Sequence, residues 1–235
     1  MGFDSAQTML LGIVLSDLII QEKTNSLTPQ SAETLLEITV SRVLSTYEDE
    51  LVSSNNLLDF VFLAYLYQDD IASLRGLILS SSEDSELIAC RLGLMSLTKC
   101  MLDRTSYELY FSTVWKLSSG ISDDYDMTIR KIGHVLGWGS ETHALRHIGS
   151  GEKPQEIVTQ VLYCILRHPN NYLAAVKCAT QITQNSEVIA HLIGALVGLR
   201  LNTDKSYQQQ CIQPINYAKI SDLAKILTNL RDSRS

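Results

Sequence analysis

The feature that most constrains this chain is the stretch 186–200, in which two helical patterns overlap. Pairs of large apolar residues recur there with the period of a helix that buries a broad stripe; the pairs are Val188 with Ile189, Leu192 with Ile193, and Leu196 with Val197. Ala190, Gly194 and Gly198 form a second row, four residues apart, where the missing side chains let another backbone come close. The sequence therefore predicts a helix enclosed on two sides, with its small-residue row against a second helix.

Helical periods continue along most of the chain, and no segment alternates convincingly with the period of two that is typical of strands. The helices that we expect cover residues 3–20, 31–46, 57–67, 87–102, 106–117, 154–167, 171–182, 186–200 and 218–231. No internal repeat or clear boundary divides them. The chain has 235 residues, of which 45% are hydrophobic, so it can bury one sizeable core. We expect an all-α protein with a single compact multi-helix domain over residues 1–235.

Charge and composition exclude several classes of partner. The 19 Lys and Arg residues against 26 Asp and Glu residues give a net charge of −7 and form no basic patch, which argues against nucleic acids and anionic membranes. The longest apolar run, Met9 to Ile20, is interrupted by polar residues and is shorter than the roughly 20 residues of a spanning helix. Five scattered cysteines suggest reduced thiols rather than disulfides. We expect a soluble cytoplasmic protein.

The segment 183–199, TQNSEVIAHLIGALVGL, resembles the signature of the ADP-ribosylglycohydrolase family. That signature is Gly-Gly-Asp-Thr-Asp-Thr followed by a small-residue helix that ends in Gly-Ala-Leu-x-Gly, and the end matches residues 194–198. At the start, Asn185 and Glu187 stand in place of the two aspartates, and Val188 replaces the last threonine. The resemblance implies the all-helical fold of that family, with an altered metal-binding motif at the start of this helix.

Three further segments carry the resemblance. Residues 162–176, LYCILRHPNNYLAAV, are similar to the family's Ala-Leu-Tyr-x-x-Leu-Arg-x-Pro-x-Asp-Phe-x-x-Ala-Val. Residues 12–20, GIVLSDLII, resemble its opening Gly-Leu-x-x-Gly-Asp-x-x-Gly and keep Asp17, although an aspartate satisfied near the end of its helix is our preferred interpretation. Aligning Thr34 with the end of the family's Thr-Asp-Asp-Thr places Ser31, Ala32 and Glu33 on the other positions.

The resemblance implies hydrolysis of the N- or O-glycosidic bond that links ADP-ribose to a side chain, with two magnesium or manganese ions that orient the ribose and activate water. The matching positions hold Glu33, Glu187, Asn185, Ser31 and Thr34 as metal ligands, with Glu187 and Glu33 as the catalytic candidates. Hard cations need several oxygen ligands, preferably carboxylates, and only two of these residues carry one. We therefore expect metal binding that is weak or absent, at a site where the starts of helices 31–46 and 186–200 meet.

Two functions are compatible with a site in which the aspartates of the family's metal-binding motifs are replaced. The favoured one is a binding or regulatory pseudoenzyme that keeps the helical body and recognises ADP-ribose or an ADP-ribosylated protein. The alternative is a divergent metal-dependent hydrolase that removes ADP-ribose or a related glycosyl group, with Glu187 or Glu33 as base.

Other polar patterns are weaker. His143 and His147 are four residues apart, but two imidazoles without a third ligand do not make a zinc site. The glycines of 132–151 lack the order of a nucleotide fingerprint, and the resemblance places a flexible loop here, at the border of the substrate cleft. Asp69 and Asp70 are typical of a solvated helix end.

Overall fold

The computed structural model describes residues 5–24, 30–45, 56–81, 84–181, 184–200 and 217–233, and every regular element in these ranges is helical. The expected all-α class is therefore confirmed. The helices are α1 (Ser5–Thr24), α2 (Gln30–Ser45), α4 (Leu57–Leu66), α5 (Ile71–Ser81), α6 (Ser85–Leu102), the short 3-10 helix η1 (Tyr107–Leu109), α7 (Tyr110–Ser118), α8 (Asp123–Val135), α9 (Glu141–Ile148), α10 (Pro154–Arg167), α11 (Tyr172–Ala179), α12 (Ser186–Arg200) and α14 (Tyr217–Asp232).

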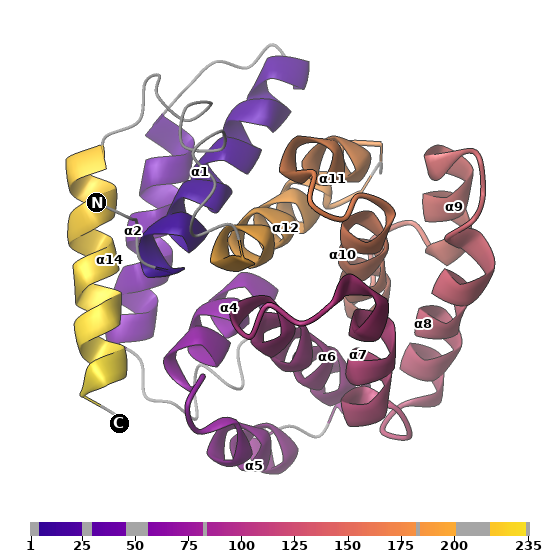
Figure 1. The fold of residues 1–235 in the computed structure, drawn as a ribbon, viewed down its shortest axis with the longest axis horizontal. Helices are drawn as coiled ribbons and strands as arrows, with labels where there is room; N and C mark the ends of the chain where they lie inside the picture. Colours follow the sequence, from indigo (N-terminus) through magenta and orange to yellow (C-terminus); the bar gives the residue numbers. More distant parts are fainter. Residues whose placement is uncertain are drawn as a thin grey trace.

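Helix α12 lies in the middle of the fold, and the other helices are arranged around it (Figure 1). It packs against α1 on one side and against α4, α6, α10 and α11 on the others. Every residue from Ile189 to Leu199 is buried, whereas Glu187 and Val188 at its start are exposed. The predicted enclosure of this helix is confirmed for all but its first turn.

The backbones of α1 and α12 approach each other closely along the small-residue row. A Cβ atom added to Gly194 would overlap the carbonyl group of Gly12, and one added to Gly198 would overlap the carbonyl group of Thr8. The hydroxyl of Tyr172, from α11, donates a 2.7 Å hydrogen bond to the carbonyl of Gly12 at the same place. We call this contact the α1–α12 crossing. Helix α1 is therefore the second helix against which the small-residue row was predicted to pack.

Helix α1 continues to Thr24, four residues beyond the expected end. Apolar side chains stop near Ile20, but the polar residues that follow are good helix formers and continue the helix. Asp17 therefore lies inside the helix and is buried, so our preferred placement of it near a helix end was wrong.

Several polar clusters of the sequence mark helix starts. Ser122 accepts a hydrogen bond from the backbone N–H of Tyr125, and the acidic residues after it lie in the first turn of α8, where the helix dipole favours them. The side chain and then the backbone N–H of Ser73, at the start of α5, hydrogen-bond Asp70 and lower its pKa. Asp69 and Asp70 therefore mark an exposed helix boundary, as expected.

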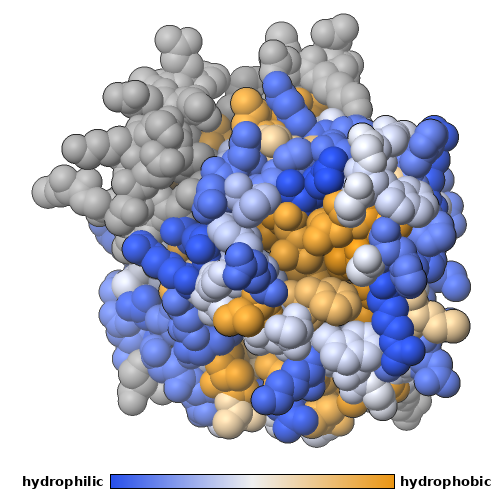
Figure 2. Space-filling model, turned by 45° about the vertical axis from the view of Figure 1, so that its right-hand side comes forward, coloured by the Kyte–Doolittle hydropathy of each residue, from blue (hydrophilic) through white to orange (hydrophobic). Residues whose placement is uncertain are grey.

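Most large apolar side chains of the described residues lie in one core. On the face seen in Figure 2, apolar atoms also reach the surface in a hollow strip framed by hydrophilic residues. The described cysteines, Cys90, Cys100, Cys164 and Cys178, are buried free thiols, as expected. Among the helices that the structure describes, none has the length and apolar character needed to cross a bilayer.

Candidate functional site

A pocket of about 460 Å³ lies where the starts of α4, α10 and α12 come together. Apolar walls with a few polar groups are typical of small-molecule sites, and the volume is within the range of such sites. The residues that line it are Asn56, Leu57, Leu58, Glu152, Pro154, Ile157, Asn185, Val188 and His191. The pocket thus lies at the start of α12, the position to which the sequence resemblance directed attention.

Asn185 joins the start of α12 to the loop before α10. Its backbone has a φ of 47°, in the left-handed region that asparagine tolerates better than most residues. Its side-chain amide donates a 2.8 Å hydrogen bond to the carbonyl oxygen of Gly151. Because this amide is directed to a backbone carbonyl, Asn185 acts here as a clamp on the loop.

The carboxylate of Glu156, in the first turn of α10, holds the same loop from the other side. Its Oε2 atom accepts hydrogen bonds from the N–H of Gly151 at 2.9 Å, the N–H of Glu152 at 3.2 Å and the hydroxyl of Ser150 at 3.2 Å. Gly151 has a φ of 85°, which favours glycine at this position.

The buried amide of Gln160, also on α10, anchors the beginning of the loop. Its Nε2 atom donates to the carbonyl oxygens of Gly149 at 3.0 Å and of Leu145 at 3.3 Å. The segment 132–151, expected as a flexible loop at the border of the cleft, is instead largely helical, because it contains the end of α8 and all of α9. The nearby residues that line the pocket are Glu152 and Pro154, and these bonds tie the short loop before α10 to α10 and to the start of α12. Sequence reasoning missed Glu156 and Gln160, because each looked like an ordinary polar position on an amphipathic helix.

His191 and Asp17 form a buried pair at the pocket. The Nε2 atom of His191 is 3.4 Å from Oδ1 of Asp17, and the two residues are 9% and 8% exposed. An imidazole oriented by a carboxylate can exchange a proton or a hydrogen bond with a ligand. Sequence reasoning missed His191, although its place in the apolar stripe of α12, one turn after Glu187, was a signal.

Of the expected metal ligands, Asn185 lines the pocket. Glu187 is exposed in the first turn of α12 and is not part of the lining, and Thr34 is exposed on α2. The side chains of Ser31 and Glu33 lie outside the part of the chain that the structure describes. The meeting of Glu33 with Glu187 therefore stays a prediction.

The described lining of the pocket does not fit a pair of magnesium or manganese ions. Glu152 supplies its one carboxylate, and the amide of Asn185 is bonded to Gly151. Two neighbouring dications repel each other and need several acidic oxygens around them.

His143 and His147 are both exposed on α9, and the ring of His147 lies against Trp138 with the ring centres 5.1 Å apart. The two imidazoles are not part of a group of three metal-ligating side chains in the described ranges.

No protein-family model matches the chain, and no curated protein matches it. The resemblance to ADP-ribosylglycohydrolases therefore rests on the sequence motifs alone.

Proposed function

We propose that this chain is an ADP-ribosylglycohydrolase-like protein that binds ADP-ribose, or an ADP-ribosylated protein, in the pocket at the start of α12 and acts as a binding or regulatory pseudoenzyme. The observation that carries the proposal is the composition of this pocket. It combines apolar walls with the His191–Asp17 pair, and its described lining has a single carboxylate, Glu152.

The chemistry of ADP-ribose suits such a lining. Leu57, Ile157 and Val188 offer apolar surface for an adenine or a ribose face, and the His191 ring can hydrogen-bond a hydroxyl group. The free N–H groups and the dipole at the start of α12 favour a phosphate. Hydrolysis makes a further demand, because the family's reaction uses two cations and the described lining does not fit them. The lining therefore favours binding of ADP-ribose without its hydrolysis.

The divergent hydrolase remains the alternative, and metal dependence separates the two. We expect ADP-ribose to raise the melting temperature of the full chain equally with magnesium, with manganese and with a chelator, because a ligand that binds the folded form stabilises it. No release of ADP-ribose from a modified protein is expected.

Asn185→Gly is the informative variant, because glycine accepts the left-handed backbone while the clamp on Gly151 is lost. We expect weaker ADP-ribose binding by calorimetry. Glu187→Gln is the matched control at the same helix start, outside the lining, and should bind as the parent does. The pseudoenzyme is ruled out by metal-dependent release of ADP-ribose that Glu187→Gln abolishes. Failure of ADP-ribose to bind at all would reject both functions.

A further inference from the structure

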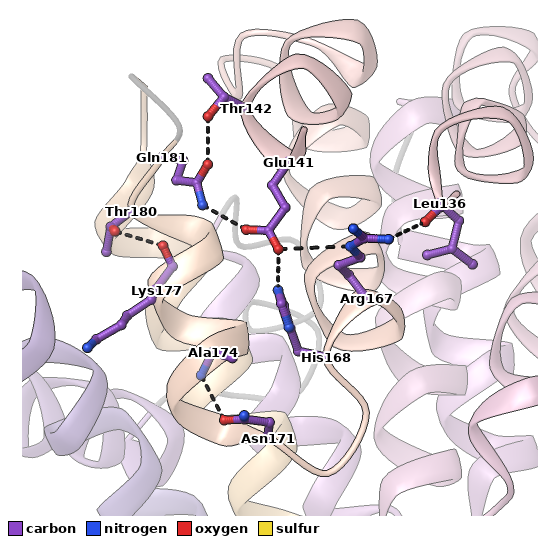
Figure 3. A network of polar contacts seen from close by, with 10 residues as sticks. All are labelled: Leu136, Glu141, Thr142, Arg167, His168, Asn171, Ala174, Lys177, Thr180 and Gln181. Atoms are coloured by element: carbon purple, nitrogen blue, oxygen red, sulfur yellow. Dashed lines mark hydrogen bonds and ion pairs between the residues drawn. The ribbon is translucent and has the colours of Figure 1, made fainter. Parts of the chain in front are cut away.

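Three potential metal ligands from separate elements meet near the end of α10, whereas the loop 149–153 is bonded to its first half. Glu141 begins α9, His168 ends α10, and Cys178 lies near the end of α11. Their ligand atoms, a carboxylate oxygen, a ring nitrogen and a thiol sulfur, all lie within 4.8 Å of one another. Figure 3 shows the carboxylate of Glu141 directed to His168, with the Oε1 to Nε2 distance at 2.7 Å.

A second layer of bonds orients the carboxylate of Glu141. The amide of Gln181 donates to its Oε2 atom at 2.7 Å, and the amide oxygen of Gln181 accepts from the hydroxyl of Thr142 at 2.6 Å (Figure 3). Arg167 donates to the carbonyl of Leu136 at 2.9 Å and also forms an ion pair with Glu141, in which its Nε atom is 3.9 Å from Oε1. The Oε2 atom of the carboxylate is thus held by Gln181, while Oε1 faces His168 and Arg167. Such outer bonds are typical around metal-ligating carboxylates.

Two buried polar atoms on α10 and just after its end lack an aligned hydrogen bond. Nε2 of His168 forms an ion pair with Oε1 of Glu141 at 2.7 Å, although the contact is not aligned as a hydrogen bond. The hydroxyl of Tyr163, a fully buried residue, has no partner either. Tyr163 lies on α10, which ends at this cluster. Buried polar atoms are usually satisfied, so the His168 nitrogen without an aligned hydrogen bond is consistent with a ligand at this place.

We propose that Glu141, His168 and Cys178 bind one divalent transition-metal ion, for which Zn2+ is the best chemical match. Oxygen, nitrogen and sulfur donors are all zinc ligands, and in a tetrahedral site they lie about 3.3–3.8 Å apart, a small adjustment from the present positions. The thiolate makes magnesium a poor competitor. The thiol of Cys164 contacts that of Cys178 and is a further potential donor beside the site. Binding releases the thiol proton of Cys178.

The site is independent of the proposed ADP-ribose pocket, and its role is structural. The ion ties the start of α9 to the end of α10 and to α11, which directly precedes the segment leading to α12. A metal bound to the folded chain alone adds its binding free energy to folding.

The test is a titration of the metal-free full chain with Zn2+ and with Co2+, followed by calorimetry and absorbance. We expect one ion per chain and, with cobalt, a thiolate-to-cobalt charge-transfer band in the near ultraviolet. Cys178→Ser should remove that band, and His168→Gln should abolish tight binding. Gln181→Ala, which disturbs the outer bonds, should weaken the affinity by about 10–100-fold.

His147→Gln is the matched control, an exposed histidine on α9 outside the cluster, and should leave the affinity unchanged. Far-ultraviolet circular dichroism of each variant identifies any that fail to fold, and Glu141→Gln then provides a near-isosteric replacement. The proposal is overturned if the parent chain binds no zinc, if cobalt binds without the thiolate band, or if the folded Cys178→Ser and His168→Gln variants bind as tightly as the parent.

Discussion

Helix α1 packs on α12 at the α1–α12 crossing, and the loop 149–153 packs near the start of α12. The two contacts are stabilised in opposite ways. At the crossing, two backbones touch because Gly194 and Gly198 have no side chains, so any added atom meets the carbonyls of α1. The loop is held by side chains that reach backbone groups, chiefly from Glu156, Gln160 and Asn185. The crossing should therefore be sensitive to added volume, and the loop to lost hydrogen-bonding groups.

The largest effect is expected from Gly194→Leu. The new side chain has to displace the backbone of α1, and overpacking of this kind costs about 1–3 kcal/mol or more of unfolding free energy. Gly133→Ala is the control, because that glycine is an exposed helical position with nothing near its missing Cβ. The control should be neutral or gain up to about 1 kcal/mol. Urea unfolding measures both, and equal stabilities would contradict the close contact.

Gln160→Met tests the loop without changing side-chain volume greatly. Loss of the amide leaves the carbonyls of Gly149 and Leu145 without this donor, and the expected cost is about 1–3 kcal/mol. Gln155→Met is a matched control, a buried glutamine on the same helix. The amide oxygens of both glutamines lack a partner, so the comparison isolates the two hydrogen bonds that Gln160 donates. Chemical denaturation should show a larger loss of unfolding free energy for Gln160→Met than for Gln155→Met. The reverse result would contradict the view that side-chain hydrogen bonds stabilise the loop.

Tyr172→Phe should have a smaller effect, because it deletes one neutral hydrogen bond at the crossing while keeping the ring. The lost bond to the carbonyl of Gly12 is 2.7 Å long and buried, and its net worth is about 0.5–1.5 kcal/mol. Thermal unfolding measures the loss. A cost well below that of Gly194→Leu would show that packing rather than hydrogen bonding stabilises the crossing.

Tyr163→Phe should change least at neutral pH, because the hydroxyl of Tyr163 has no partner in the metal-free protein. The difference emerges in alkali. Burial raises the folded-state pKa of Tyr163 to about 12, so above the ordinary value of about 10 the unfolded chain loses this proton first, and stability falls as the pH rises from about 10 to about 12. Phenylalanine should reduce this fall, as measured by urea unfolding at several pH values. An unchanged pH profile would contradict the raised pKa.

The two regions also differ in what the sequence reveals. Gly194 and Gly198 recur at helical spacing, so the sequence pattern itself predicts a close contact for α12. The period of apolar residues predicts the buried faces of the other amphipathic helices in the same way. The bonds of Glu156 and Gln160 run to backbone atoms of a preceding loop, and no residue type or spacing in that loop encodes them.

Similar reasons explain the remaining differences. The polar SDDYD segment, residues 122–126, lies outside the helices expected from the sequence, yet its acidic residues stabilise the first turn of α8. The cluster of Glu141, His168 and Cys178 was invisible because its members come from three elements and share no motif. The histidine pair that has helical spacing in the sequence, His143 and His147, lies exposed on α9 and outside this cluster.

The α1–α12 crossing also sets the order in which this chain can complete its fold. Asp17 and His191, which meet there, are 174 residues apart, so at 5–20 residues per second a ribosome needs about 9–35 s to produce the second after the first. During that time α1, which is apolar on nearly all sides, has no α12 to cover it. Contacts between such distant segments also form slowly. Nascent α1 is thus a segment that a chaperone can be expected to bind, and its docking on α12 has to wait until synthesis has passed residue 200.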